Sequence, residues 1–218
     1  MVKQKQKKVV IMMPEGRLIN HSLFEKDVYV DPKTSKEGTP SYKVEMVYEP
    51  GQVQGEGTVE DIILDFLEET LGKEYTDLYL DGKVPGPFVD GNEKAKAREK
   101  KGKAGDAYAG KLILRSNTQY NRDGADGPGG VQVFGPNVEK IGLLEGNSAD
   151  VYPGCYGVLA GTLHVWGDPD TKDWGVKIYL SAFQKTRDGE RLVPITDHST
   201  LFEPAQAAAI EAPARRRR

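Results

Sequence analysis

Most of this chain shows the alternation of hydrophobic and polar positions that is typical of β-strands, in which every second side chain points to the same face. Residues 41–48 show it most clearly, because the apolar or aromatic side chains from Tyr42 to Tyr48 fall at every second position. Turn-forming residues at 167–170 join the last two long runs, which we expect to form a hairpin. With that pair included, further strands are predicted at residues 8–13, 17–24, 111–116, 131–134, 155–166 and 174–186.

One segment has a helical period instead. Its apolar residues between Val59 and Leu71 recur every three or four positions, so they would form one stripe along an α-helix. Thr58 is a suitable N-cap for this helix, and Gly72 is a suitable C-terminal stop. The pattern therefore predicts one amphipathic helix that packs its apolar stripe against a sheet.

Three stretches lack both periods. Residues 93–105 are rich in Lys and Arg, residues 121–130 are rich in Gly and Asp, and residues 201–218 are rich in Ala and Pro and end in Arg215–Arg218. We expect the first two to be flexible loops and the last to be a flexible tail, which leaves residues 1–200 as one domain. A mainly β chain with one helix and long loops fits a closed or nearly closed small barrel, while strand spacing alone leaves a β-sandwich open.

Composition and charge narrow the classes of function. The chain has 218 residues, a length that fits one large domain. It carries 30 Lys and Arg against 33 Asp and Glu, so its formal net charge of −3 excludes a uniformly basic binder and leaves room for a local basic face. The longest unbroken apolar run, residues 9–13, is far too short for a membrane-spanning helix or a signal-peptide core, so we expect a cytosolic protein.

Motifs for catalysis and metal binding are weak. Residues 105–111 have the spacing of a phosphate-binding loop, but Leu112 stands where a hydroxyl would hold magnesium, and no helix follows. Residues 121–127 lack the alternating oxygen ligands of a calcium loop. Cys155 is the single cysteine and lies in an apolar strand, where a thiol is usually inert. We therefore predict no catalytic residue, no metal site and no cofactor.

Aromatic and basic residues interleave on the last predicted strand. In the alternation, Lys177, Tyr179, Phe183 and Lys185 share one face, and the opposite face is apolar. Such a face suits single-stranded nucleic acid, because bases stack on rings at ~1–3 kcal/mol each while ammonium groups meet the phosphates. The alternative is that these rings cover a second small core under the loops.

The predicted interface combines stacking rings, phosphate-binding side chains and a flexible basic flank. The stacking candidates are Tyr108, Tyr120, Tyr156, Trp166, Tyr179 and Phe183. The phosphate candidates are Lys111, Arg115, Arg122, Lys177 and Lys185. The basic flank comprises Lys94, Lys96, Arg98, Lys100, Lys101 and Lys103.

Four blocks of the sequence resemble the single-stranded-DNA-binding proteins of tailed phages. They are residues 85–92, 108–116, 150–156 and 174–191, and the resemblance spans roughly residues 7 to 193. The last block is the most specific, because a Gly-x-x-x-x-Leu-x-x-x-Gln strand ends in an Arg-Asp-Gly-Glu-Arg turn.

The resemblance implies an OB-fold, a five-stranded barrel with one α-helix and long loops. It also implies a protein without catalytic activity or metal that binds single-stranded DNA without sequence specificity in phage DNA replication, recombination or repair. Such a protein would act in the host cytoplasm as a monomer or homodimer, away from membranes, and would meet phage or host replication proteins. Residues 211–218 end in four arginines where many such proteins have an acidic tail, which argues against partner recruitment through that kind of tail.

Two other classes of function stay open. The first is a β-sandwich structural or assembly protein of a virion, which would self-associate through exposed strand edges and bind no nucleic acid. The second is an enzyme that acts on nucleic acid or sugar through carboxylates such as Asp90 or Asp106. Spacing along the chain favours neither.

Overall fold

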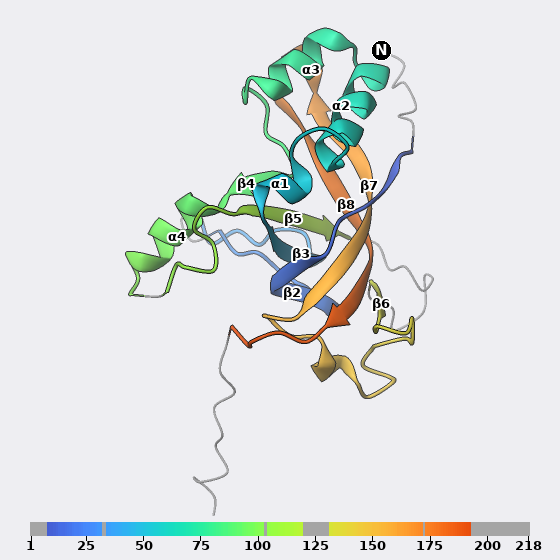
Figure 1. Cartoon of the computed structure of the whole chain (residues 1–218). Helices are drawn as coiled ribbons and strands as arrows, with labels where there is room; N and C mark the ends of the chain where they lie inside the picture. Colours follow the sequence, from blue (N-terminus) through green and yellow to red (C-terminus); the bar gives the residue numbers. More distant parts are fainter. Residues whose placement is uncertain (1–7, 32–33, 103, 120–130, 172, 193–218) are drawn as a thin grey trace, which may run out of the picture.

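Five strands form a nearly closed ring at the centre of the molecule (Figure 1). The computed structural model describes residues 8–31, 34–102, 104–119, 131–171 and 173–192. The strands of the ring are β2 (Gly16–Asp27), β3 (Ser41–Tyr48), β5 (Leu112–Thr118), β8 (Asp173–Arg187) and β7 (Tyr156–Asp168), in that order around the barrel.

The ring closes through one parallel contact. All other neighbours in the ring pair antiparallel, whereas β5 and β8 run parallel and share one registered pair, Asn117 with Tyr179. The buried Ser116 hydroxyl strengthens this junction by donating to the Ile178 carbonyl at 2.6 Å. Closure of the ring gives the barrel that the sequence predicted and does not fit the β-sandwich that strand spacing had left open.

Shorter elements surround the ring. Strand β1 (Val10–Met12) pairs with β7, β4 (Phe88–Asp90) pairs with β5, and β6 (Gln132–Phe134) pairs with β8. The predicted helix is present as α2 (Val59–Thr70), and Thr58 caps it by accepting a hydrogen bond from the Glu60 amide. The structure adds three α-helices and two short 3-10 helices, which are α1 (Pro50–Val53), α3 (Lys73–Leu80), α4 (Gly91–Glu99), η1 (Ser148–Asp150) and η2 (Pro169–Thr171).

The β7–β8 hairpin is longer than the barrel is tall. Its outer part, residues 163–171 and 173–178, projects beyond the ring beside α2 and α3 (Figure 1), and we call it the arm. The Trp174 ring on its inner face meets the Tyr75 ring edge-on at 5.6 Å. The hairpin that the sequence predicted is thus present, and α3 packs against its inner side.

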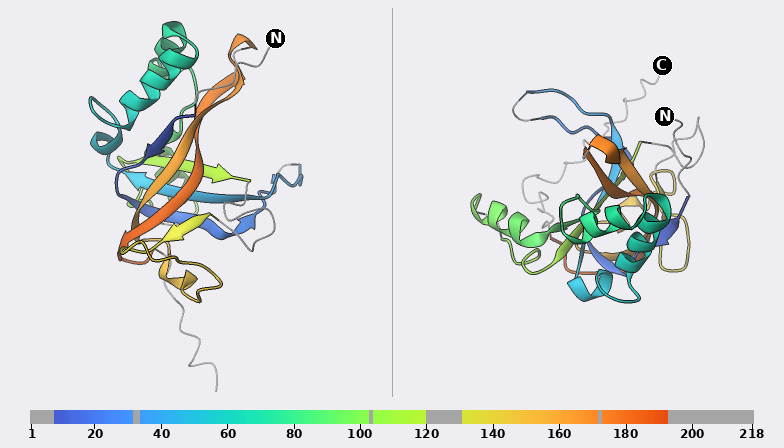
Figure 2. Two further views of the ribbon diagram at one scale, coloured as in Figure 1. Left: turned by 90° about the vertical axis from the view of Figure 1, so that its right-hand side faces the viewer. Right: turned by 90° about the horizontal axis from the view of Figure 1, so that it is seen from above.

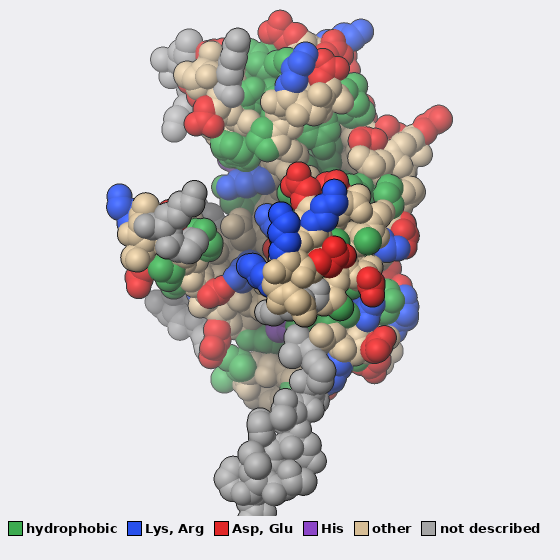
Figure 3. All heavy atoms as spheres, turned by 90° about the vertical axis from the view of Figure 1, so that its left-hand side faces the viewer, with side chains coloured by type: hydrophobic (Ala, Val, Ile, Leu, Met, Phe, Trp, Pro, Cys, Tyr) green, Lys and Arg blue, Asp and Glu red, His purple; other side chains and the backbone are tan. Residues whose placement is uncertain are grey.

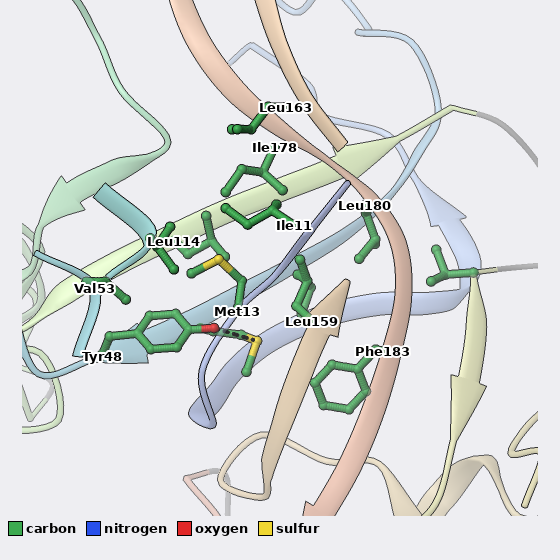
Figure 4. Close-up of a cluster of buried hydrophobic side chains, with 14 of the residues drawn as sticks. Ile11, Met13, Tyr48, Val53, Leu114, Leu159, Leu163, Ile178, Leu180 and Phe183 are labelled. Carbon is green, nitrogen blue, oxygen red and sulfur yellow. Dashed lines mark hydrogen bonds between the residues drawn. The ribbon is translucent and has the colours of Figure 1, made fainter. Parts of the chain in front are cut away.

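Apolar side chains from strands along the whole described part of the chain, from β1 to β8, fill the ring. Figure 4 shows Met13, Leu114, Leu159 and Leu180 pointing toward one another in this core. The predicted inner face of β3 is confirmed, because its side chains at every second position from Tyr42 to Tyr48 are buried there. No helix in the described ranges is long and apolar enough to cross a membrane.

The basic run after β4 differs from the prediction of a flexible loop. Most of it forms α4, which begins where the Asp90 carboxylate accepts from the Asn92 amide at 2.8 Å. Ala95 anchors the helix in a second, smaller apolar cluster that covers part of the outside of the barrel. Residues 193–218 lie outside the described residues, so the predicted tail and the 1–200 domain boundary stay predictions.

Candidate nucleic-acid interface

The outer faces of β3, β5 and β8 form a surface bordered by projecting elements. In the view from above (Figure 2, right), α4 projects from one side of the barrel and the loop between β2 and β3 projects beside it. Figure 3 shows that this side is hollowed below the lobe formed by α2, α3 and the arm, and that Lys and Arg side chains gather beside the hollow.

Polar side chains line the floor of this surface. Because the side chains of β3 between Tyr42 and Tyr48 alternate with buried ones, Lys43 and Glu45 point outward. On β5, Arg115 and Asn117 point outward in the same way and lie opposite Glu45 and Lys43, respectively. The floor therefore carries two cations, one carboxylate and one amide.

Four side chains on the adjoining strands form a patch, here called the aromatic patch. It consists of His164, Trp166, Lys177 and Tyr179, which share the outer face of the β7–β8 hairpin. The Lys177 ammonium lies 4.1 Å from the centre of the Tyr179 ring, and the His164 ring centre lies 5.1 Å from that of Tyr179. Since Asn117 pairs with Tyr179, the patch continues the floor without a break.

The Trp166 ring packs against the strand opposite. A Cβ atom at Gly175 would come within 2.8 Å of this ring and 2.7 Å of the Pro85 carbonyl oxygen, so only glycine fits there. Like Tyr179, Trp166 remains half-buried rather than enclosed, which a stacking platform requires.

His164 is the titratable group of the aromatic patch. Partial burial lowers the pKa of His164 below its ordinary value, and the nearby positive charge of Lys177 lowers it further. The imidazole is therefore neutral at pH 7 in the free protein.

Helix α4 forms one wall of the surface and is tied to the floor. Its Lys94 ammonium donates to the Glu45 carboxylate at 2.5 Å, and Arg115 approaches the other oxygen of that carboxylate at 3.0 Å. Lys94 and Arg98 also lie 5.3 and 5.1 Å from the centre of the Tyr108 ring. Of the predicted basic flank, Lys94 and Arg98 are therefore half-buried, while Lys96, Lys100 and Lys101 are exposed.

Three predicted binding residues are buried. Tyr108 lies in the second apolar cluster, as in the alternative in which such rings cover a small core under the loops. Phe183 has no exposed surface, and Lys185 is buried beside Asp188 at 2.7 Å. A side chain without exposed surface cannot stack on a base, so Phe183 in particular belongs to the core.

A β-bulge explains the wrong prediction for β8. Gly161 pairs with Leu180 and Ala160 with Ala182, so Ser181 is an extra residue on one strand. One extra residue reverses which face every later side chain occupies. Phe183 therefore turns inward, although strict alternation placed it beside Tyr179.

The remaining predicted residues are spread over the barrel. The Arg187 guanidinium lies over the Tyr156 ring, 3.4 Å from its centre. Tyr156 is six residues along β7 from Thr162, the residue that pairs with Tyr179, which places Tyr156 about 20 Å from the aromatic patch. Lys111 forms an ion pair with Glu49. Lys103, Tyr120 and Arg122 lie outside the described residues.

Sequence reasoning missed two side chains that border the surface. Tyr29, in the loop between β2 and β3, is 67% exposed, and it belongs to no predicted strand that would have drawn attention to it. Lys43 lies on the floor and pairs with Asp27. The alternation of β3 places Lys43 on the outer face and so could have identified it.

Across the described ranges, no three His, Cys, Asp or Glu side chains come together as a metal site. Burial raises the pKa of the Cys155 thiol, which agrees with the interpretation of Cys155 as an inert core residue.

Comparisons with known proteins bear on the fold. No family model matches the sequence, and no curated protein matches it. Among solved structures, the single-stranded DNA-binding protein of bacteriophage Enc34 in complex with ssDNA matches with a TM-score of 0.54 and 14% identity, over 88% of this chain and 97% of that one. The chain has the fold of a phage single-stranded-DNA-binding protein.

A second phage protein supports this assignment. Gp2.5, a single-stranded DNA binding protein encoded by bacteriophage T7, matches with a TM-score of 0.52 and 11% identity, over 93% of this chain and all of that one. The OB-fold that the resemblance implied is therefore confirmed. At these identities the likeness concerns the fold, and the binding residues have to be argued from the surface itself.

Proposed function

We propose that this protein binds single-stranded DNA without sequence specificity, has no catalytic activity, and protects the strand during phage DNA replication, recombination or repair. The observation that carries the proposal is the aromatic patch, in which Tyr179, Trp166 and Lys177 adjoin a polar strand floor on the outside of an OB-fold barrel. In OB-folds, this outer strand face and the loops beside it are where oligonucleotides bind.

In the proposed mechanism, aromatic rings bind the bases and cations bind the phosphates. Bases stack on the exposed faces of Tyr179 and Trp166, which favours unpaired strands of any sequence because every base has a π-face. Phosphates meet Lys177 in the patch and Arg115 on the floor, and these contacts weaken with salt because they release counterions. The exposed lysines of α4 extend the basic rim beyond the floor.

Duplex DNA should bind much more weakly. Its bases are already stacked and paired, so the rings of the patch gain no contact with their faces. A net charge of −3 gives the whole molecule no general attraction to polyanions, so affinity depends on the local cations of this face.

A titration tests the proposal directly. Fluorescence anisotropy with labelled oligo-dT and with a duplex of matched length, each at several NaCl concentrations, should show salt-sensitive binding of oligo-dT and much weaker binding of the duplex. Equal affinity for both, or none for oligo-dT, would overturn the proposal.

One observation favours self-association, as in the alternative of a virion assembly protein. Val10 and Met12 on the outer strand β1 are 64% and 69% exposed, and within the described residues this strand pairs with β7 on one side and with no strand on the other. Light scattering with and without oligo-dT separates the two cases. Self-association without oligonucleotide binding would favour the assembly protein. The same measurement tests the predicted monomer or homodimer state, while the replication partners stay predictions.

A further inference from the structure

The floor of the proposed interface contains a carboxylate where a phosphate-binding surface would be expected to carry positive charge only. Glu45 lies on β3, the middle of three adjacent strands, between Asn20 of β2 and Arg115 of β5. Its side chain is 18% exposed. A negative group at this place repels the phosphates of an approaching strand.

Two cations hold the Glu45 carboxylate from different elements. Lys94 of α4 donates to one oxygen at 2.5 Å, and Arg115 of β5 approaches the other at 3.0 Å. Lys94 lies over the Tyr108 ring on its own helix, and the register of β5 fixes the backbone position of Arg115. The two cations would therefore keep their positions if a different anion lay between them.

A DNA phosphate offers these cations the same acceptors as a carboxylate. Charge-assisted hydrogen bonds from Lys or Arg to carboxylate and to phosphate oxygens have similar lengths and directions. The contact with Arg115, whose side chain is 56% exposed, is weak, because ion pairs near solvent are weak. The Lys94 and Glu45 side chains are 23% and 18% exposed, so a phosphate has to take over the Lys94 contact as it displaces the carboxylate.

We propose that Lys94 and Arg115 form one phosphate subsite and that Glu45 occupies this subsite in the free protein as an internal competitor, which a DNA phosphate displaces. This inference rests on the proposed function and adds to it a residue that limits affinity. Strand binding must then break the Glu45 contacts first, so the protein binds less tightly than its cations alone would allow.

The inference predicts the sign of one mutation. Glu45→Gln keeps the shape of the side chain and removes its charge, so oligo-dT affinity should rise by about 3- to 10-fold. The salt dependence should steepen by up to about 0.7 in the slope of log affinity against log salt, the value for one more phosphate contact on a single strand. If Glu45 merely positions the two cations, the same change should lower affinity.

A matched control separates local from global charge. Asp81→Asn makes the same change in net charge at the surface pair of Asp81 with Lys83, which lies 2.8 Å apart at the end of α3. Affinity should change less than twofold in this control. In the double variant Glu45→Gln/Lys94→Gln, the gain should be lost, because the subsite lacks one of its cations.

Anisotropy titrations of full-length protein with oligo-dT, together with thermal melts, decide the matter. An unchanged or lower affinity for Glu45→Gln, with the parent protein still binding oligo-dT, overturns the inference. Should Glu45→Gln melt early, Glu45→Asp replaces it, since a shorter carboxylate loosens both contacts and should also raise affinity. A parent protein that binds no oligo-dT overturns the proposed function instead, which is a different result.

Discussion

At the scale of single residues, Tyr179 and Phe183 lie four positions apart on β8 and have opposite environments. Tyr179→Ala should lower oligo-dT affinity by about 5- to 100-fold, the effect of losing one stacked base at ~1–3 kcal/mol, and leave the melting temperature nearly unchanged. Phe183→Ala should lower the free energy of unfolding by about 3–5 kcal/mol, because it opens a cavity in a fully buried site. Anisotropy and thermal melts read the two effects separately. If Tyr179 were a core residue and Phe183 the stacking residue, Tyr179→Ala would lower the stability and Phe183→Ala the oligo-dT affinity.

A second residue-scale prediction concerns pH. Burial and the charge of Lys177 lower the pKa of His164 in the free protein, so the ring is uncharged at pH 7. A phosphate bound beside the patch would raise that pKa, so binding takes up a proton and affinity should increase as the pH falls from 8 to 6. Titrations at fixed ionic strength across this range measure the effect.

The control for this prediction is His164→Asn, which removes the titrating group and keeps a polar side chain. Its affinity should be nearly independent of pH over the same range. If the variant follows the same pH profile as the parent protein, some other group takes up the proton.

These residues also show where the alternation of apolar and polar positions predicts side-chain orientation correctly and where it does not. It correctly placed Lys177 and Tyr179 on an outer face, because β8 is regular up to Leu180. It failed beyond Ser181, since a one-residue bulge leaves no trace in an alternation of apolar and polar types. Tyr108 lies outside the predicted strands, so alternation does not apply to it, and its burial depends on contact with Ala95 of α4 in the second apolar cluster.

At the scale of elements, α4 shows why a helix can escape prediction. Only Gly91 and Ala95 are buried along its length, so it has almost no apolar stripe. Its sequence therefore has the pattern of a charged loop. What forms it is the Asp90 cap together with ion pairing and ring contacts that Lys94 makes with the barrel. Helix α2, which has a full apolar stripe, was predicted with its cap.

The ordered α4 gives a prediction about salt. Lys96→Gln/Lys100→Gln removes two exposed cations from the rim, so oligo-dT affinity at low salt should fall by about 3- to 30-fold, and the salt slope should become shallower by up to about 1.4. The difference from the parent protein should shrink as NaCl rises. Titrations at several salt concentrations measure both quantities.

A matched pair of lysines serves as the control. Lys73→Gln/Lys83→Gln makes the same change in net charge at exposed positions on and just beyond α3. Its affinity and slope should stay close to those of the parent protein. Equal effects from both double variants would mean that only total charge matters.

At the scale of the whole molecule, the sequence predicted the strands of the ring but not the order in which they pair. Alternation predicts that a segment is a strand and which side is apolar, and it is silent on neighbours. The OB-fold was expected from sequence blocks such as residues 174–191, and the comparison with solved structures confirms the fold. The parallel β5–β8 contact that closes the ring has no local signal, because its partners lie about 60 residues apart.

The β5–β8 contact contributes both to ring closure, through Ser116, and to the proposed binding surface, through Asn117 and Tyr179. Ser116 is 3% exposed and points into the ring, where its hydroxyl donates to the Ile178 carbonyl. Ser116→Ala leaves this buried carbonyl without that donor, at a cost of about 1–3 kcal/mol. For a chain of this size, the melting temperature should fall by roughly 2–12 °C.

Binding should respond differently from stability in Ser116→Ala. The outward neighbours Asn117 and Tyr179 keep their places while the ring stays folded, so the oligo-dT affinity measured at 10 °C should match that of the parent protein within twofold. Since ligand adds stability according to its concentration over Kd, saturating oligo-dT should then raise both melting temperatures by similar amounts. A loss of affinity at 10 °C without a loss of stability would show that the hydroxyl serves the strand-binding surface rather than ring closure.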